Sequence, residues 1–455
     1  MSTLARDVPL ATASTTSLRR ATWALAWPVI FSFSIESFVG LCDTLMVGRL
    51  GATAVAAVGV GVQILGAVDS MLFAVGTGAL AIVARHVGAA DRRAAEETLR
   101  QSIVAAAALS TLAVIPVFAW APALIGAFRV DAAVVAIGTP FVRLVVCGVP
   151  AGATLFVIVS SLRGAGDTRT PLAIGAVVGV VNVVAAYALI FGHFGLPALG
   201  VAGAALATAL AFVAGATLGL VVLARQALVL RLRWRPFRLH TDVVGRVLRI
   251  GYPAAIEHLL MQVGFFLYIV FAARYGTAAV AAYFIGVRIL ALSFLPGFGF
   301  AAAAGAMVGQ SLGAGRPRDA ERSGWAALNL ALWLMSAAGV AIFVAARPIA
   351  RLFVDDAAVI ADAVSFIRVL AVAQPLMAID FTLGGALRGA GDTVRVMAIN
   401  LGSTILVRFV GVMIVVFYFR RGLVAVWCVL ASELFLRGLM IWVRFEKGRW
   451  RELEV

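Results

Sequence analysis

The stretch SLRGAGDTRTP, residues 161–171, decides the fold because most of it occurs twice in the chain. Residues 162–168 read LRGAGDT, and residues 387–393 repeat these letters at an offset of 225 positions. The same offset relates Pro28 to Pro253, Gly51 to Gly276, Gly88 to Gly313 and Pro150 to Pro375. A register kept across so much of the chain indicates an internal duplication. We therefore expect two halves with the same fold.

The composition indicates a membrane protein. Hydrophobic residues make up 63% of the 455 residues and charged residues 13%, and the mean hydropathy is +1.03. Soluble domains are about half apolar and about a quarter charged. The net charge of +15 would favour nucleic-acid binding in a soluble chain, but basic residues of membrane proteins gather in cytoplasmic loops. We expect the lipid bilayer as a partner and no nucleic acid.

Twelve apolar runs are long enough to cross a bilayer, which takes a helix of about 20 residues. They are residues 23–47, 53–84, 101–124, 135–160, 170–192, 199–224, 247–273, 279–309, 325–346, 358–385, 396–419 and 423–444. Six runs fall in each half, so both halves enter the membrane from the same side. We predict an all-α integral membrane protein of twelve transmembrane helices, with two six-helix lobes related by a pseudo-twofold axis along the membrane normal.

Basic residues concentrate in the segments that join these runs on one side of the membrane. The positive-inside rule then predicts that both termini are cytoplasmic. The predicted parts are an N-terminal segment (1–22), an N-lobe (23–224), an interlobe linker (225–246), a C-lobe (247–444) and a C-terminal tail (445–455). The linker and both terminal segments are expected in the cytoplasm.

The repeated motif and the cysteines give no sign of a cofactor or a metal. The glycines of LRGAGDT permit a tight turn, and its Asp and Thr can cap the following helix. The spacing fits neither a Walker A loop nor a dinucleotide fingerprint. Cys42, Cys147 and Cys428 lie in apolar runs without metal-ligand spacing. We therefore predict a structural role for the motif and no cofactor.

Three acidic residues of the first half fall inside predicted spans: Glu36, Asp43 and Asp69. A charge at the bilayer centre costs about 2.5–3.5 kcal/mol on insertion scales. Each of these acids is therefore expected to have a functional role or a structural partner. Glu36 and Asp43 are seven residues apart and share one helix face. A sequestered carboxyl such as Asp43 can exchange a proton or Na⁺. The alternative is that Asp43 caps its helix or pairs with Arg49.

Several features together resemble the multidrug and toxic compound extrusion (MATE) family. These are Pro28 followed by Asp43, Gly51 followed by an AVAAVG run, LRGAGDT in both halves, and GAMVGQSLGA at residues 305–314. The pattern is closer to the DinF-like than to the NorM-type members. The resemblance implies two lobes facing each other across a central cleft, which export organic compounds by alternating access driven by H⁺ or Na⁺.

The resemblance also implies roles for single residues of the first half. Asp43 matches the family's coupling aspartate, Asn182 the asparagine beside it, and Thr208 a threonine ligand. Where related DinF-type members have a second aspartate, this chain has Ala186. One carboxylate fewer favours H⁺ over Na⁺, although Na⁺ at Asp43 stays possible. Pro28 lacks a backbone donor, so we predict a kink in helix 1.

The second half differs from the first, because Tyr268 stands where the offset would place a second Asp43. Candidate polar residues of the cavity are Asp69, Glu257, His258, Gln262, Tyr268 and Asp380. Glu257 and Asp380 do not match the NorM-type cation ligands, so they either line the cavity or pair internally. Glu433 and Arg437 are expected to neutralise each other as an i, i+4 pair. Arg408 is expected to tie helices together.

We predict a monomeric antiporter of the inner membrane that exports amphipathic, often cationic organic compounds. Asp43 and Glu36 would carry the coupling cation, with Asn182 and Thr208 shaping the pocket. A lipid-linked saccharide flippase of the same superfamily is the alternative, although it would favour a strongly cationic cleft. A membrane-embedded enzyme would need clustered His or carboxylates, such as HExxH or paired acids on adjacent helices, and none is found. We therefore do not expect an enzyme.

Overall fold

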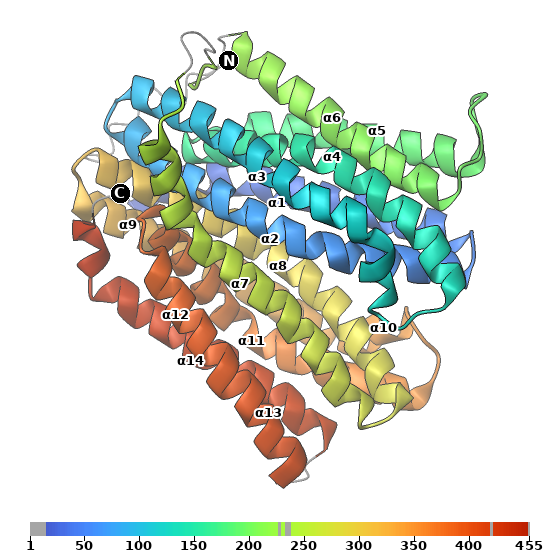
Figure 1. Cartoon of the computed structure of the whole chain (residues 1–455). Helices are drawn as coiled ribbons and strands as arrows, with labels where there is room; N and C mark the ends of the chain where they lie inside the picture. The colour runs from blue at the N-terminus through green and yellow to red at the C-terminus, as the bar shows by residue number, and fades with distance from the viewer. Residues whose placement is uncertain (1–14, 226–228, 233–237, 419–421, 454–455) are drawn as a thin grey trace. The chain divides into compact units, whose positions relative to one another are not determined.

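The computed structural model describes residues 15–225, 229–232, 238–418 and 422–453, and every regular element in these ranges is helical (Figure 1). The elements are α1 (Thr15–Gly48), α2 (Ala52–Gly88), α3 (Arg92–Gly126), α4 (Ala132–Gly164), α5 (Arg169–Phe191), α6 (Val201–Ala224), α7 (Thr241–Ala273), α8 (Thr277–Gly313), α9 (Pro317–Val344), α10 (Ala346–Arg351), α11 (Ala357–Gly389), α12 (Thr393–Ser403), η2 (Thr404–Val410), α13 (Gly411–Met413), η3 (Ile414–Tyr418), α14 (Leu423–Glu446) and η4 (Arg449–Glu452). Parts of the predicted N-terminal segment, linker, eleventh span and C-terminal tail lie outside the described residues: 1–14, 226–228, 233–237, 419–421 and 454–455.

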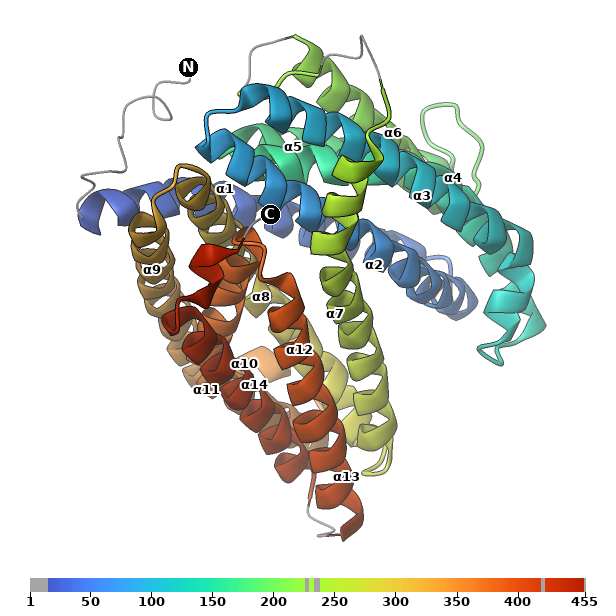
Figure 2. The same ribbon diagram turned by 60° about the vertical axis from the view of Figure 1, so that its left-hand side comes forward.

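The twelve predicted spans are confirmed within the described residues. Several helices extend beyond the predicted apolar runs because polar turns continue them. α3, for example, begins nine residues before the run 101–124, and the Asp91 carboxylate caps it by accepting a hydrogen bond from Ala94 N at 3.0 Å. The eleventh span, Thr393–Tyr418, which carries the labels α12 and α13 in Figure 2, contains the two π-helical stretches η2 and η3. The apolar pattern of the eleventh span does not predict these π-helical stretches.

The chain forms two compact units. Unit 2 comprises Phe31–Ala255, and unit 1 comprises the residues up to Ile30 together with Ile256–Val455. Both limits fall inside continuous helices, α1 and α7. Pro28 and Pro253, which the repeat relates to each other, each precede a limit by two residues. The predicted lobes 23–224 and 247–444 remain our proposal for the functional halves.

The helix that ends in the repeated motif is the centre of each unit. In unit 2, α4 packs against α2, α3 and α6, and in unit 1, α11 packs against α8, α9 and α14. The first glycine of each motif has no room for a side chain. A Cβ at Gly164 would lie 2.5 Å from the carbonyl oxygen of Leu80, and one at Gly389 would lie 2.5 Å from Gly305 Cα. Leu80 and Gly305 are themselves 225 residues apart, so the structure repeats this helix crossing.

The second half of the motif folds as a turn in both units but makes different contacts. Gly166 and Gly391 have φ angles of 85° and 88°, which only glycine adopts readily. Asp167 accepts hydrogen bonds from Thr170 N at 3.0 Å and Thr170 Oγ1 at 2.6 Å. Asp392 instead forms an ion pair with Arg444 at 2.6 Å. The motif therefore encodes the turn, whereas the partners of its acid depend on the unit.

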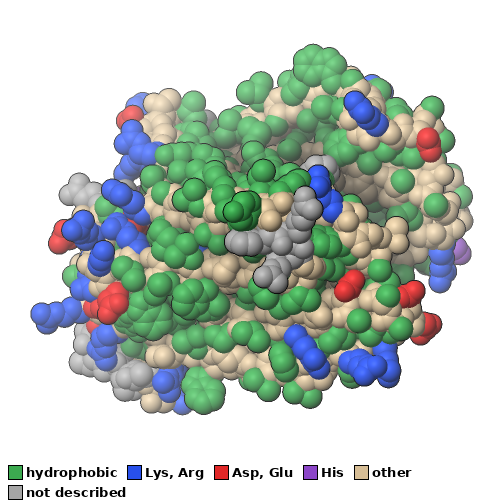
Figure 3. Space-filling view, turned by 90° about the horizontal axis from the view of Figure 1, so that it is seen from below, with side chains coloured by type: hydrophobic (Ala, Val, Ile, Leu, Met, Phe, Trp, Pro, Cys, Tyr) green, Lys and Arg blue, Asp and Glu red, His purple; other side chains and the backbone are tan. Residues whose placement is uncertain are grey.

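Large hydrophobic side chains are exposed along the spans, for example Leu112, Phe38 and Trp333 (67%, 63% and 77% exposed). On the face shown in Figure 3, hydrophobic side chains dominate. Water would penalise such a surface, whereas acyl chains solvate it. The protein is therefore a multi-pass membrane protein.

Candidate functional site

Asp43 of α1 and Asn182 of α5 meet inside unit 2. With the amide oriented so that its nitrogen faces the carboxylate, Asn182 Nδ2 donates hydrogen bonds to Asp43 Oδ1 at 3.0 Å and Oδ2 at 3.2 Å. In the opposite orientation the same nitrogen lies 3.4 Å from Thr208 Oγ1 of α6. The amide therefore stands between the Asp43 carboxylate and the Thr208 hydroxyl.

Local packing explains why these side chains meet. Gly179 lies about one turn before Asn182 on α5, and a Cβ there would lie 3.0 Å from Val39 Cγ2 and 3.1 Å from Ile35 Cγ2. The glycine lets α1 approach α5 closely. Val39 lies about one turn before Asp43, so the next contact along the two helices joins Asp43 to Asn182.

The surroundings of this cluster are neutral. Thr208 Oγ1 donates to the carbonyl of Ala204 at 3.1 Å, and Ala186 is fully buried. Asn182 is buried, and Asp43 is partly exposed. No ion pair among the residues that the structure describes includes Asp43, and none joins it to Arg49. A single carboxylate held by a neutral amide can gain or lose a proton without breaking an ion pair.

Glu36 lies apart from the Asp43 cluster and faces a different group. It interacts electrostatically with Arg163 of α4 and with Asp69 of α2. Glu36 and Asp69 are both exposed, whereas Arg163 is partly buried. The Arg163 guanidinium lies 5.2 Å from the centre of the Phe33 ring on α1. Unit 2 therefore holds two polar groups along α1, one around Asp43 and one around Glu36.

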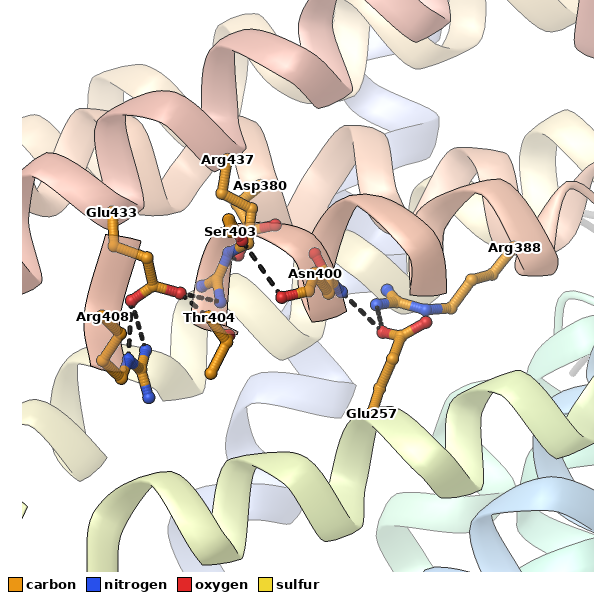
Figure 4. Close-up of polar contacts among 9 residues, drawn as sticks. All are labelled: Glu257, Asp380, Arg388, Asn400, Ser403, Thr404, Arg408, Glu433 and Arg437. Atoms are coloured by element: carbon orange, nitrogen blue, oxygen red, sulfur yellow. Dashed lines mark hydrogen bonds and ion pairs between the residues drawn. The ribbon is translucent and has the colours of Figure 1, made fainter. Parts of the chain in front are cut away.

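The acids of unit 1, by contrast, are paired with arginines (Figure 4). Glu257 of α7 forms an ion pair with Arg388 of α11 at 2.5 Å and accepts a hydrogen bond from Asn400 Nδ2 of α12 at 2.7 Å. Asp380 of α11 pairs with Arg437 of α14 at 2.7 Å. Of the two readings that the sequence left open for Glu257 and Asp380, the contacts support internal pairing.

Glu433 of α14 is the most completely satisfied acid of this network. It accepts hydrogen bonds from Arg408 Nε at 2.8 Å, Arg408 Nη2 at 2.5 Å and Thr404 Oγ1 at 3.1 Å. The expected contact with Arg437 exists at 3.3 Å but is the longest of the set. Three acids and three arginines of unit 1 therefore balance each other.

The other residues predicted for the cavity differ in how far they are buried. His258 and Gln262 lie partly exposed on α7. Tyr268 packs in a hydrophobic core cluster of unit 1. It is 3% exposed and stacks with Tyr283 and Trp427 in the core, with ring centres 6.4 Å away in both cases. An aromatic ring in place of an aspartate suits an apolar core better than a polar cavity.

Sequence reasoning missed four polar residues of these groups: Arg163, Arg388, Asn400 and Thr404. The two arginines were expected to satisfy the C-terminal carbonyls of their helices and were given no side-chain partners. Their signal was present, because both stand at the same place in the repeat, directly before the glycine that packs on the neighbouring helix. Asn400 lies in the polar first turns of the eleventh span and gave no pattern of its own.

Comparison with protein families identifies the architecture. The family model MatE matches residues 28–188 and 253–414, which is one match in each half of the duplication. The chain belongs to the MatE family. A relative described as a probable multidrug resistance protein NorM, from Thermotoga maritima, is 29% identical over 445 residues, which cover 96% of this chain and 94% of the relative. The multidrug resistance protein PmpM of Pseudomonas aeruginosa is 28% identical and covers 83% and 80%.

A solved structure supports the MatE fold. A multidrug resistance MATE transporter of the MOP superfamily, described in an outward-facing conformation, superposes with a TM-score of 0.88 at 23% identity. The match covers 95% of this chain and 96% of that one. The two-lobe fold of twelve helices is thus shared. The DinF-like subtype stays a prediction.

Proposed function

We propose that this MatE-family protein is a proton-coupled antiporter that exports amphipathic, often cationic organic compounds, with Asp43 as the coupling group. The family and the relatives named for multidrug resistance support efflux. In the proposed cycle, protonation of Asp43 rearranges α1 and releases the substrate, and deprotonation allows the next substrate to bind.

The observation that carries the proposal is the difference between the acids of the two units. Glu257, Asp380 and Glu433 each have an arginine within 2.8 Å, so each is part of an ion pair. Asp43 has an amide instead. An unpaired charge in a low dielectric is costly, and protonation removes that cost. Unlike the three acids of unit 1, Asp43 can therefore change its charge without breaking an ion pair.

The donors around Asp43 favour a proton over Na⁺. A hard cation needs several oxygen ligands and gains from more than one carboxylate. Asn182 and Thr208 offer uncharged oxygens, but Asp43 is the one carboxylate of the three residues, and Ala186 supplies no oxygen. Within the described residues, no cluster of three or more His, Cys, Asp or Glu side chains could hold a metal ion. We therefore propose H⁺ as the coupling ion.

The proposed setting is the inner membrane, with both termini in the cytoplasm and the protein acting as a monomer. We do not propose a flippase for lipid-linked saccharides. Such a protein would benefit from unpaired cations that bind pyrophosphate, whereas Arg388, Arg408 and Arg437 are all engaged by acids. We also propose no enzymatic activity.

Gradient-driven uptake in proteoliposomes tests the proposal. With an acidic interior and no Na⁺, the parent protein should accumulate tetraphenylphosphonium, and Asp43→Asn should reduce this accumulation to the level of empty liposomes. Asp355→Asn is the matched control, because it removes an exposed carboxylate from the loop between α10 and α11. Accumulation by Asp43→Asn at the parent rate would remove Asp43 from the mechanism, and uptake that requires a Na⁺ gradient would refute proton coupling.

A further inference from the structure

We infer that the arginine of the duplicated motif is a positioning residue for the first helix of each half: Arg163 holds α1 against α4, and Arg388 holds α7 against α11. The glycines and aspartates of the motif are sufficient to form its turn. The arginine is not needed for the turn and therefore has a separate role. Both arginines stand at the last turn of the central helix of their unit. Each reaches a side chain on the first helix of its own half.

In unit 2 the motif arginine, Arg163, contacts the face of an aromatic ring on α1. The Arg163 guanidinium lies 5.2 Å from the centre of the Phe33 ring, and Glu36 lies one turn further along α1 within electrostatic range. Arg163 makes no ion pair among the residues that the structure describes, and its Nε atom has no hydrogen-bond partner there. Asp69 and Glu36 repel each other electrostatically. The contact with α1 is therefore loose.

In unit 1 the equivalent arginine makes a direct ion pair. Arg388 Nη2 lies 2.5 Å from Glu257 Oε2 on α7, and Asn400 Nδ2 donates to the same oxygen at 2.7 Å (Figure 4). Glu257 is 11% exposed, so water competes little for this contact. One carboxylate thus joins three helices: α7, α11 and α12.

The two contacts differ in the strength with which they hold their helices. A charge-assisted hydrogen bond that is shielded from water is stronger than a cation–π contact beside exposed acids. Arg388 therefore fixes α7, whereas Arg163 allows α1 to leave and return. Because α1 carries Asp43, Arg163 determines how closely Asp43 is held to Asn182. This last step rests on the proposed function, whereas the helix contacts do not.

Cys42 offers a direct probe of the position of α1. It precedes Asp43 and, with Val183 and Tyr187 of α5, lines an apolar pocket on the seam between the two helices. The other two cysteines, Cys147 and Cys428, are exposed. With both replaced by serine, a change in the rate at which N-ethylmaleimide labels the partly exposed Cys42 reports a change in the position of α1 against α5. The rate is measured by intact mass on the full-length protein.

We expect Arg163→Gln to raise the labelling rate about two- to thirty-fold, the range that corresponds to the free energy of a cation–π contact. Arg163→Lys, which keeps the charge but not the planar group, should give an intermediate rate. Phe33→Leu should also raise the labelling rate of Cys42. If Arg163→Gln does not fold, Phe33→Leu alone tests the contact between Arg163 and Phe33. Parent-like labelling of both Arg163→Gln and Phe33→Leu would overturn the role of Arg163.

The second motif arginine is the matched control. Arg388→Gln should leave the labelling of Cys42 unchanged and lower the unfolding temperature, and Glu257→Gln/Arg388→Gln should recover part of that loss. Equal unfolding temperatures for the parent, Arg388→Gln and the double variant would overturn the role of Arg388. If Asp43→Asn transported normally while Arg163→Gln still changed the labelling of Cys42, the proposed function would fail and the positioning role would stand.

Discussion

The pair formed by Arg408 and Glu433 should stabilise unit 1 without taking part in transport. Glu433 is fully buried and Arg408 is 8% exposed, and two hydrogen bonds of 2.8 and 2.5 Å join them. Removing one partner of such a pair leaves the other as an unpaired buried charge, which costs about 3–5 kcal/mol. The two single variants should nevertheless differ.

Glu433→Leu leaves the Arg408 guanidinium without an acid and should cost about 3–5 kcal/mol of unfolding free energy. Arg408→Met leaves Glu433 with Arg437 at 3.3 Å and Thr404 at 3.1 Å, so its cost should fall below that range. The double variant Arg408→Met/Glu433→Leu removes both charges. It should lose about 1–2 kcal/mol, since Thr404 loses its acceptor and Arg437 loses its weaker partner.

SDS titration in mixed micelles measures these free energies, and the four proteins form a double-mutant cycle. We expect the double variant to be more stable than Glu433→Leu and to accumulate tetraphenylphosphonium at the parent rate. Additive losses, with the double variant the least stable of the four, would refute the ion-pair account. Loss of transport by a stable double variant would show that the charges of unit 1 are functional.

Further predictions concern packing and the Asp43 cluster. Gly164→Ala and Gly389→Ala should each lower the unfolding free energy by about 1–3 kcal/mol, because the new methyl group meets backbone atoms. Gly402→Ala is the control and should not lower it, because the space around Gly402 is open. SDS titration of the three variants measures these changes. Asn182→Leu removes the amide that donates to Asp43. It should lower the rate of pH-driven uptake about 10- to 150-fold, the effect of losing a hydrogen bond of about 1.5–3 kcal/mol to a charged group, whereas Asn182→Gln should keep part of the rate. Pro28→Ala restores a backbone donor in α1 and should slow uptake while the unfolding temperature stays equal or rises, and a parent rate would argue against a functional kink at this position.

Much of the fold could be predicted from the sequence because apolar length and repeat register are both local properties of the chain. The offset of 225 found in the motif reappears as the contacts of Gly164 with Leu80 and of Gly389 with Gly305. The two π-helical stretches could not be predicted in this way. They change the backbone pattern inside a span whose hydropathy is ordinary.

The candidate site was predicted only in part. Asp43 stood out as a carboxyl inside an apolar run, but Asn182 and Thr208 came from resemblance, and their contacts depend on how α1, α5 and α6 pack. The i, i+4 spacing correctly found Glu433 beside Arg437. It could not find Arg408, which is 25 residues away in the chain and makes the shorter contacts.

Proton release on substrate binding tests the central claim most directly. If protonation of Asp43 weakens substrate binding, linkage requires that substrate binding expels protons. In weakly buffered detergent solution near the midpoint of this titration, tetraphenylphosphonium should release protons from the parent protein and from Asp355→Asn, and it should release none from Asp43→Asn. Equal proton release by the parent and by an Asp43→Asn variant that still binds tetraphenylphosphonium would contradict the account.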